Sequence, residues 1–127
     1  MDNWDDYIKQ QKGICEKYHV DWTDVDRDLF LGLADNLTTN EVPINGLRHH
    51  GQGTTCGWYI WTGQEISDKD DFFKPVCVRH LIDIKPEIIK FLGLPPGYRF
   101  LTDDKGYVDI WEDKKLLAYR YGCQHSV

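Results

Sequence analysis

The spacing of apolar residues predicts two helices in the N-terminal third of the chain. The first runs from Trp4 to Tyr18, where apolar side chains recur along one stripe of a helix. The second is expected to begin at Thr23, with Asp26 in the third position of a shortened capping box. Its apolar face consists of Val25, Leu29, Phe30, Leu33 and Leu37. Residues from about 1 to 38 are therefore expected to be helical.

The strongest strand pattern comes after a predicted loop. Residues 38–53 are rich in Asn, Gly and His and include the turn-forming pair Asn45-Gly46. From Thr54 to Thr62 the chain is β-branched and aromatic and apolar on both faces, which predicts a central strand. Gly57 inside this strand indicates a bulge or the close approach of another backbone.

One short helix is predicted in the second half of the chain. Gly63 to Lys74 forms a polar, acidic loop, and the chain from Pro75 onward fits either a short strand or the entry to a helix. Pro86 suits the first position of a helix that runs to Leu92. Gly93 is expected to end that helix in the left-handed conformation.

The C-terminal part of the chain is predicted to contain a β-hairpin, and the whole chain is predicted to have an α+β fold. The hairpin joins strands at 98–102 and 107–111 through a turn at 103–106. Leu116 and Leu117 are expected to return to the core, and residues 119–121 fit an edge strand. With 127 residues the chain has the usual length of one domain. We therefore expect a single domain with N-terminal helices packed on a mostly antiparallel sheet, which occupies residues from about 54 to 127.

The net charge of the chain indicates which class of ligand it binds. The formal net charge is −6, and the longest basic run is the pair Lys114-Lys115. Nucleic-acid binders usually carry a basic face that displaces counterions from phosphate, so nucleic acid is not expected as the ligand. A basic protein partner fits better, because complementary potentials speed encounter. A charge of −6 is also within the ordinary range for solubility, and this alternative stays open.

The cellular compartment is predicted from the first residues of the chain, the length of its apolar runs and its cysteines. The acidic start of the chain at Met1 to Asp6 is unlike a signal peptide, and no apolar run has the roughly 20 residues that span a bilayer. Four cysteines lie far apart at Cys15, Cys56, Cys77 and Cys123. They fit reduced thiols in a core. We expect a cytoplasmic protein without a membrane partner and without a cofactor.

Two kinds of chemistry, a zinc site and a thiol-dependent catalytic site, are alternatives to a binding role. His49, His50, Cys56, Cys77 and His80 supply possible zinc ligands. Cys77-x-x-His80 has a usable ligand spacing, but structural zinc sites usually use two tight pairs, and the adjacent His49-His50 would point in opposite directions in an extended chain. Cys56 with His80 and Asp83 could form a thiol-dependent site, yet Cys56 lies in a strand-like apolar run that does not favour a thiolate. The alternative function is a small metal-binding or thiol-dependent hydrolytic domain that uses Cys56, Cys77 and His80.

The predicted binding surface combines acids with aromatic rings. Rigid aromatic side chains surrounded by acids suit an interface with a basic partner. The acidic loop carries an adjacent Phe72-Phe73 pair, and the hairpin tip carries two further acids. The predicted partner-binding residues are Glu65, Asp68, Asp70, Asp71, Phe72, Phe73, Asp103 and Asp104. Alternatively, the two Phe rings fold back onto the sheet and the acids are only a solvated loop.

Part of the chain resembles a bacterial immunity-protein family, the thirty-third of the Imm series. The segment Cys56-Gly57-Trp58-Tyr59-Ile60-Trp61-Thr62-Gly63-Gln64-Glu65 is similar to the family's Gly-Trp-aromatic and Gly-acidic-Glu signature, with Cys56 where a small hydroxyl residue is usual. Similar patterns continue through Leu94-Pro95-Pro96-Gly97-Tyr98 to Tyr107-x-Asp109-x-Trp111, so the resemblance covers about 54–117. It implies a cytoplasmic antidote that binds a cognate protein toxin, a basic nuclease or another secreted effector, and occludes its active site. The resemblance brings no catalytic residues.

Overall fold

The computed structural model describes residues 4–34, 42–63, 73–103 and 105–118. Its elements, in chain order, are α1 (Trp4–Lys17), β1 (Phe30–Ala34), β2 (Ile44–Arg48), β3 (Thr55–Thr62), β4 (Phe73–Cys77), the 3-10 helix η2 (Val78–His80), α2 (Leu81–Ile84), the 3-10 helix η3 (Pro86–Phe91), β5 (Tyr98–Thr102), β6 (Val108–Glu112) and α3 (Lys115–Ala118). The fold is α+β in a single domain, as the sequence predicts.

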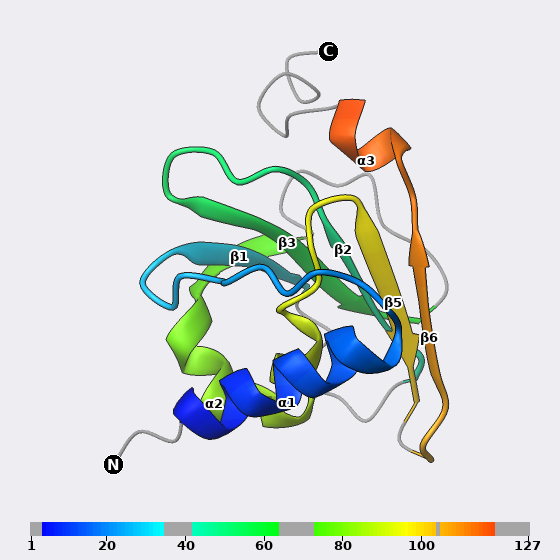
Figure 1. Cartoon of the computed structure of the whole chain (residues 1–127). Coiled ribbons are helices and arrows are strands. Elements are labelled where there is room, and N and C mark those ends of the chain that lie inside the picture. Colours follow the sequence, from blue (N-terminus) through cyan, green and yellow to red (C-terminus); the bar gives the residue numbers. More distant parts are fainter. Residues whose placement is uncertain (1–3, 35–41, 64–72, 104, 119–127) are drawn as a thin grey trace.

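The six strands form one mixed sheet in the order β4-β1-β3-β2-β5-β6. Only β1 and β3 run parallel, and the other four pairings of the described strands are antiparallel. The prediction of a mostly antiparallel sheet is confirmed. After β4 the chain passes through η2, α2 and η3 before it returns as β5 beside β2, so β4 and β6 form the two edges (Figure 1).

One face of the sheet is covered by helices, and we call it the helix-covered face. Helices α1 and α2 lie over this face (Figure 1). Its core joins residues of α1, α2 and η3 to residues of the inner strands. At its centre the rings of Phe91 and Phe100 stack with their centroids 4.6 Å apart, and Trp58 lies 5.6 Å from Phe100. All three side chains are fully buried, so this face supplies most of the hydrophobic stabilisation.

The opposite face has a smaller core, and we call it the aromatic face. Tyr59 and Trp61 point to this side because they alternate along β3 with Trp58 and Ile60. The cluster of buried residues here is Ala34, Leu47, Tyr59, Trp61 and Leu116, with Phe73 packed against it. Leu116 comes from α3, so the expected return of this residue to the core is confirmed, whereas Leu117 is exposed.

The predicted second helix is wrong, because residues 23–29 form no helix, and Phe30 and Leu33, two of its five apolar positions, belong to a strand. Phe30–Ala34 forms β1, which lies between β3 and β4 and is buried at every position from Leu31 onward. A short run that is apolar on both sides fits a helix and an interior strand equally well. Burial on both faces within a sheet, which the local pattern cannot show, decides the outcome. Leu37 lies outside the described residues.

The predicted loop at 38–53 is also partly wrong, because Ile44–Arg48 forms the interior strand β2. Asn45-Gly46 does not make a turn. A side chain at position 46 would clash with the ring of Phe100, so Gly46 is required by packing. The Asn45 side chain donates a hydrogen bond to the carbonyl oxygen of Gly63 at 2.7 Å. Both residue types serve tertiary contacts here.

The central strand, the short helix and the hairpin are confirmed, with one correction at Gly93. Gly57 has φ +97° and its Cα lies against the His49 carbonyl, which is the predicted close backbone approach. Gly93 does not adopt a positive φ. A Cβ atom there would come within 2.7 Å of the Trp22 ring, so close packing requires this glycine. The ambiguous stretch after Lys74 contains both predicted forms, first β4 and then η2 and α2. Residues 119–121 lie outside the described residues.

Candidate interaction surface

Strand pairing brings several chain segments to one end of the sheet, which we call the loop end. Phe73 pairs with Ala34 at the last position of β1, and Ile44 pairs with both Thr62 and Thr102. Because β1, β3 and β5 run in the same direction, their last residues all lie at this end. The loop end therefore holds the end of β3, the start of β4 and the turn between β5 and β6.

The two predicted partner-binding residues that the structure describes, Phe73 and Asp103, both lie at the loop end. Phe73 begins β4, and Asp103 follows directly after β5. The other predicted partner-binding residues, Glu65, Asp68, Asp70, Asp71, Phe72 and Asp104, lie outside the described residues. Four strand spacings of about 4.8 Å separate β4 from β5, which gives about 19 Å. An interface of about 800 Å² per partner is wider than this. One partner can therefore contact both residues.

Asp103 organises the turn between β5 and β6. Its Oδ1 atom accepts hydrogen bonds from the backbone N–H groups of Lys105 at 2.8 Å and Tyr107 at 2.9 Å. These hydrogen bonds, that of Lys105 first, lower the pKa of the Asp103 carboxyl below its ordinary value. Asp103 is thus a charged residue with a structural role in the turn.

Phe73 packs on the aromatic face of the sheet. Its ring makes edge contacts with Tyr59, at 5.2 Å between centroids, and with Trp61, at 6.3 Å. The side chain is half-buried, so one side of the ring contacts the sheet while the remainder is accessible. The described half of the predicted Phe72-Phe73 pair therefore contributes to packing.

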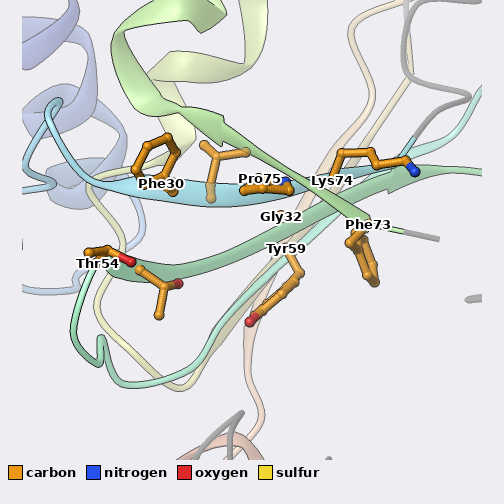
Figure 2. A pocket seen from close by; sticks show the side chains of 9 residues that line it. Phe30, Gly32, Thr54, Tyr59, Phe73, Lys74 and Pro75 are labelled. Atoms are coloured by element: carbon orange, nitrogen blue, oxygen red, sulfur yellow. The ribbon is translucent and has the colours of Figure 1, made fainter. Parts of the chain in front are cut away.

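A shallow open hollow of about 240 Å³ lies beside Phe73 on the aromatic face (Figure 2). It is lined by Phe30, Leu31, Gly32, Thr54, Thr55, Tyr59, Phe73, Lys74 and Pro75. Gly32 forms its floor, because a Cβ atom there would lie 2.5 Å from the Tyr59 ring. Phe30 is 40 % exposed at its rim. Sequence reasoning missed this hollow, and its one local signal was a glycine within an apolar run.

The two cysteines of the alternative function lie in different settings. Cys56 is buried in β3, and burial raises the pKa of its thiol, which is the opposite of what a nucleophile needs. The Cys77 thiol donates a hydrogen bond to the carbonyl oxygen of Arg27 at 3.2 Å. Within the described part of the chain, no three His, Cys, Asp or Glu side chains group closely enough to hold a metal ion.

Arg48 is a buried cation that sequence reasoning missed. Its Nη1 donates to the carbonyl oxygens of Leu94 at 2.7 Å and Leu92 at 3.2 Å, and its Nη2 donates to that of Asp24 at 3.0 Å. Burial lowers the pKa of the guanidinium from its ordinary value. Arg48 therefore joins β2 to the segments before β1 and after η3. Its place in a predicted loop gave no sign of this role.

The fold and this surface define a class, a small α+β domain whose accessible features suit contact with another macromolecule. No helix in the described ranges is both long enough and apolar enough to cross a membrane. The chain belongs to the Imm33-like domain family, whose model matches residues 10–113. The match includes most of α1, which the sequence resemblance did not cover. Comparison with curated proteins and with solved structures gives no match.

Proposed function

We propose that this protein is a bacterial immunity protein that acts in the cytoplasm, binds a cognate toxin domain and occludes its active site. The observation that carries the proposal is the family match, which spans nearly the whole described fold. The raised pKa of the Cys56 thiol also supports a binding role over thiol chemistry. A binding protein needs only a surface that is complementary to its partner.

The proposed binding surface is the loop end of the sheet. The residues proposed to bind are Glu65, Asp68, Asp70, Asp71, Phe72, Phe73, Asp103 and Asp104, of which the structure describes Phe73 and Asp103. Strand pairing supports it, because Phe73 and Asp103 lie at the same end within the span of one interface. The net charge of −6 favours a basic toxin domain, for example a nuclease.

Co-expression tests the proposed function. The toxin domain encoded beside this chain is expressed in a bacterial host with and without the protein, and colonies are counted. We expect growth only in the presence of the protein, together with a stable complex in isothermal titration calorimetry. If the toxin domain inhibits growth equally with and without the protein, and no complex forms, the proposed function is wrong.

Charge reversal tests the proposed surface. Asp70→Lys with Asp71→Lys should slow association with the toxin domain about tenfold at low salt, and the difference should shrink as salt rises. The matched control is Glu16→Lys with Asp21→Lys, which makes the same change in charge. Glu16 follows Cys15, whose thiol bonds the Gly93 carbonyl beyond the opposite end of the sheet. Equal slowing by both pairs would assign the effect to net charge alone.

A further inference from the structure

The two edges of the sheet differ in what their backbones offer. At the β4 edge, the Val78 N–H donates to the Leu29 carbonyl oxygen, so even-numbered residues of this segment face β1. Phe73, Pro75 and Cys77 therefore direct their backbone groups outward. Pro75 has no N–H, and a proline at this position prevents another strand from pairing along β4. The β4 edge is blocked.

The β6 edge has no such block. The Asp103 N–H donates to the Tyr107 carbonyl oxygen, and the Asp113 N–H donates to that of Gly97. Odd-numbered residues therefore face β5, and Val108, Ile110 and Glu112 direct their N–H and C=O groups outward. No described strand pairs with this edge, and β6 contains no proline. Three residues thus present unpaired ladder groups.

The side chains along β6 indicate the chemistry of a strand that would pair there. On the aromatic face, Asp109 and Trp111 are exposed, and on the other face Val108 and Ile110 are half-buried. Asp109 and Glu112 have no ion-pair partner among the described residues, whereas Asp113 is paired with Arg99 at 3.2 Å. Lys105, Lys114 and Lys115 lie beyond the two ends of the strand. At the middle of the edge, the aromatic face thus presents the acid Asp109 beside Trp111, whose ring has the Arg99 guanidinium at 5.6 Å. The other face presents Val108 and Ile110, with Glu112 at the end of the strand.

We propose that the outer edge of β6 binds an extended segment of the partner in which Lys or Arg alternates with apolar residues. The backbone would extend the sheet, the basic residues would meet Asp109 and the Trp111 ring, and the apolar residues would meet Val108 and Ile110. The identification of that partner as the toxin rests on the proposed function. A second copy of this chain fits less well, because antiparallel pairing centred on Ile110 places Asp109 beside Trp111 and joins two chains of charge −6.

A synthetic peptide tests the edge without any toxin. The probe is a capped heptapeptide of alternating Lys and Val, and amide hydrogen exchange of the whole protein is followed by NMR. At a peptide concentration about ten times its Kd, the N–H groups of Val108, Ile110 and Glu112 should exchange about tenfold more slowly. A matched peptide of alternating Glu and Val should leave these rates unchanged. Protection by the Lys-Val peptide at Phe73 and Cys77, the outward amides of β4, instead of at β6 would overturn the proposal.

Two variants separate backbone pairing from side-chain contact. Ile110→Pro removes one outward N–H, as Pro75 does in β4, and should abolish peptide binding. Ile110→Ala loses the same side chain but keeps the N–H, so it should still bind, and thermal melting of both variants checks the fold. Asp109→Lys should weaken the Lys-Val peptide and strengthen the Glu-Val peptide. Equal binding of the Lys-Val peptide by wild type, Ile110→Pro and Asp109→Lys would overturn the proposal.

The outcomes distinguish this inference from the proposed function. If the protein neutralises the toxin domain while the β6 amides remain unprotected by the peptide, the edge proposal fails and the function stands. If the peptide protects β6 while the toxin domain is not neutralised, the function fails and the edge remains a site for basic strands. A dimer in sedimentation that Ile110→Pro dissociates would assign the edge to a second copy and overturn the proposal.

Discussion

Trp58 and Trp61 lie on the same strand but face opposite sides of the sheet, and their indole N–H groups differ. On the helix-covered face, the Trp58 Nε1 donates a hydrogen bond to the Leu92 carbonyl oxygen at 3.0 Å. On the aromatic face, the Trp61 Nε1 is buried and has no hydrogen-bond partner among the described residues. Buried donors are usually paired, so the two indole N–H groups differ, although the Arg48 Nε on the helix-covered face is also without a partner among the described residues.

The difference extends to the neighbouring residues. On the helix-covered face, Gln11 donates to the Ile89 carbonyl oxygen at 3.1 Å and accepts from the Trp22 indole at 3.1 Å. Together with Arg48 and Trp58, these residues bond α1, η3 and β2 to one another. Because these amide, indole and Nη groups bond within the chain, the helix-covered face offers little to a partner. Recognition is therefore expected at the loop end and the β6 edge.

The largest expected effect is the loss of a ring from the helix-covered core. Trp58→Ala should lower the free energy of unfolding by about 3–5 kcal/mol, because Trp58 is fully buried. Trp111→Ala is the matched control, since Trp111 is 36 % exposed on β6 and its loss should cost about 1 kcal/mol or less. Urea unfolding measures both. A smaller loss for Trp58→Ala than for Trp111→Ala would remove the helix-covered face as the main source of stability.

A smaller effect is expected from the buried cation. Arg48→Lys should lower the free energy of unfolding by about 1–3 kcal/mol, because one ammonium cannot reach every carbonyl that the two Nη atoms bond. Arg99→Lys, which alters a partly exposed pair with Asp113, should cost less than about 1 kcal/mol. Equal losses in urea unfolding would show that the Arg48 hydrogen bonds add nothing beyond an ordinary surface pair.

Substitution of each tryptophan tests whether only the Trp58 indole N–H is hydrogen-bonded. Trp58→Phe should cost about 1 kcal/mol more than Trp61→Phe, because only Trp58 loses a hydrogen bond to a described group. Both variants replace an indole by the same phenyl ring, so the lost side-chain volume is equal in the two and cancels in the difference. Urea unfolding of the pair provides the measurement, and equal or greater loss for Trp61→Phe would mean that its N–H is paired in solution.

The smallest expected effect is the pH dependence that comes from His49. Burial lowers the pKa of His49 below its ordinary value of about 6.5, although a hydrogen bond to the Leu116 carbonyl oxygen acts in the opposite direction. The unfolded chain therefore takes up the proton first as pH falls. The contribution of neutral His49 is complete above pH 6.5 and decreases as pH falls below that value. Urea unfolding at pH 7.5 and 5.5 should give a smaller difference for His49→Gln than for wild type or exposed His80→Gln.

Local signals identified the elements whose packing is local in origin. The alternating β-branched and aromatic residues of β3 and the turn residues at 103–106 predicted the central strand and the hairpin correctly. Phe30–Ala34 and Ile44–Arg48 were misassigned, because their place between other strands comes from tertiary pairing. Gly32, Gly46 and Gly93 are required because rings from distant parts of the chain pack against them. The residues next to each glycine in the sequence therefore do not predict this packing.

The candidate surface was predictable only in part. Acid density and the Phe72-Phe73 pair are visible in the sequence, but the common end shared by Phe73 and Asp103 follows from the strand order. From Pro75 onward the sequence fits either a short strand or the entry to a helix. The place of Pro75 on the outer edge of β4 depends instead on which residues of β4 face β1. The open edge of β6 has no sequence signal, because it is defined by the position of that strand at the end of the sheet.

Hydrogen–deuterium exchange of the full chain, with and without a toxin domain that it neutralises, decides whether the loop end and the β6 edge form the binding surface. If the protein neutralises its partner through the loop end and the β6 edge, amides of Phe73, Asp103 and Val108 to Glu112 should be protected in the complex. Amides of α1 should exchange at unchanged rates, because that helix covers the closed face. Protection confined to α1 and α2, with β6 unchanged, would contradict the account.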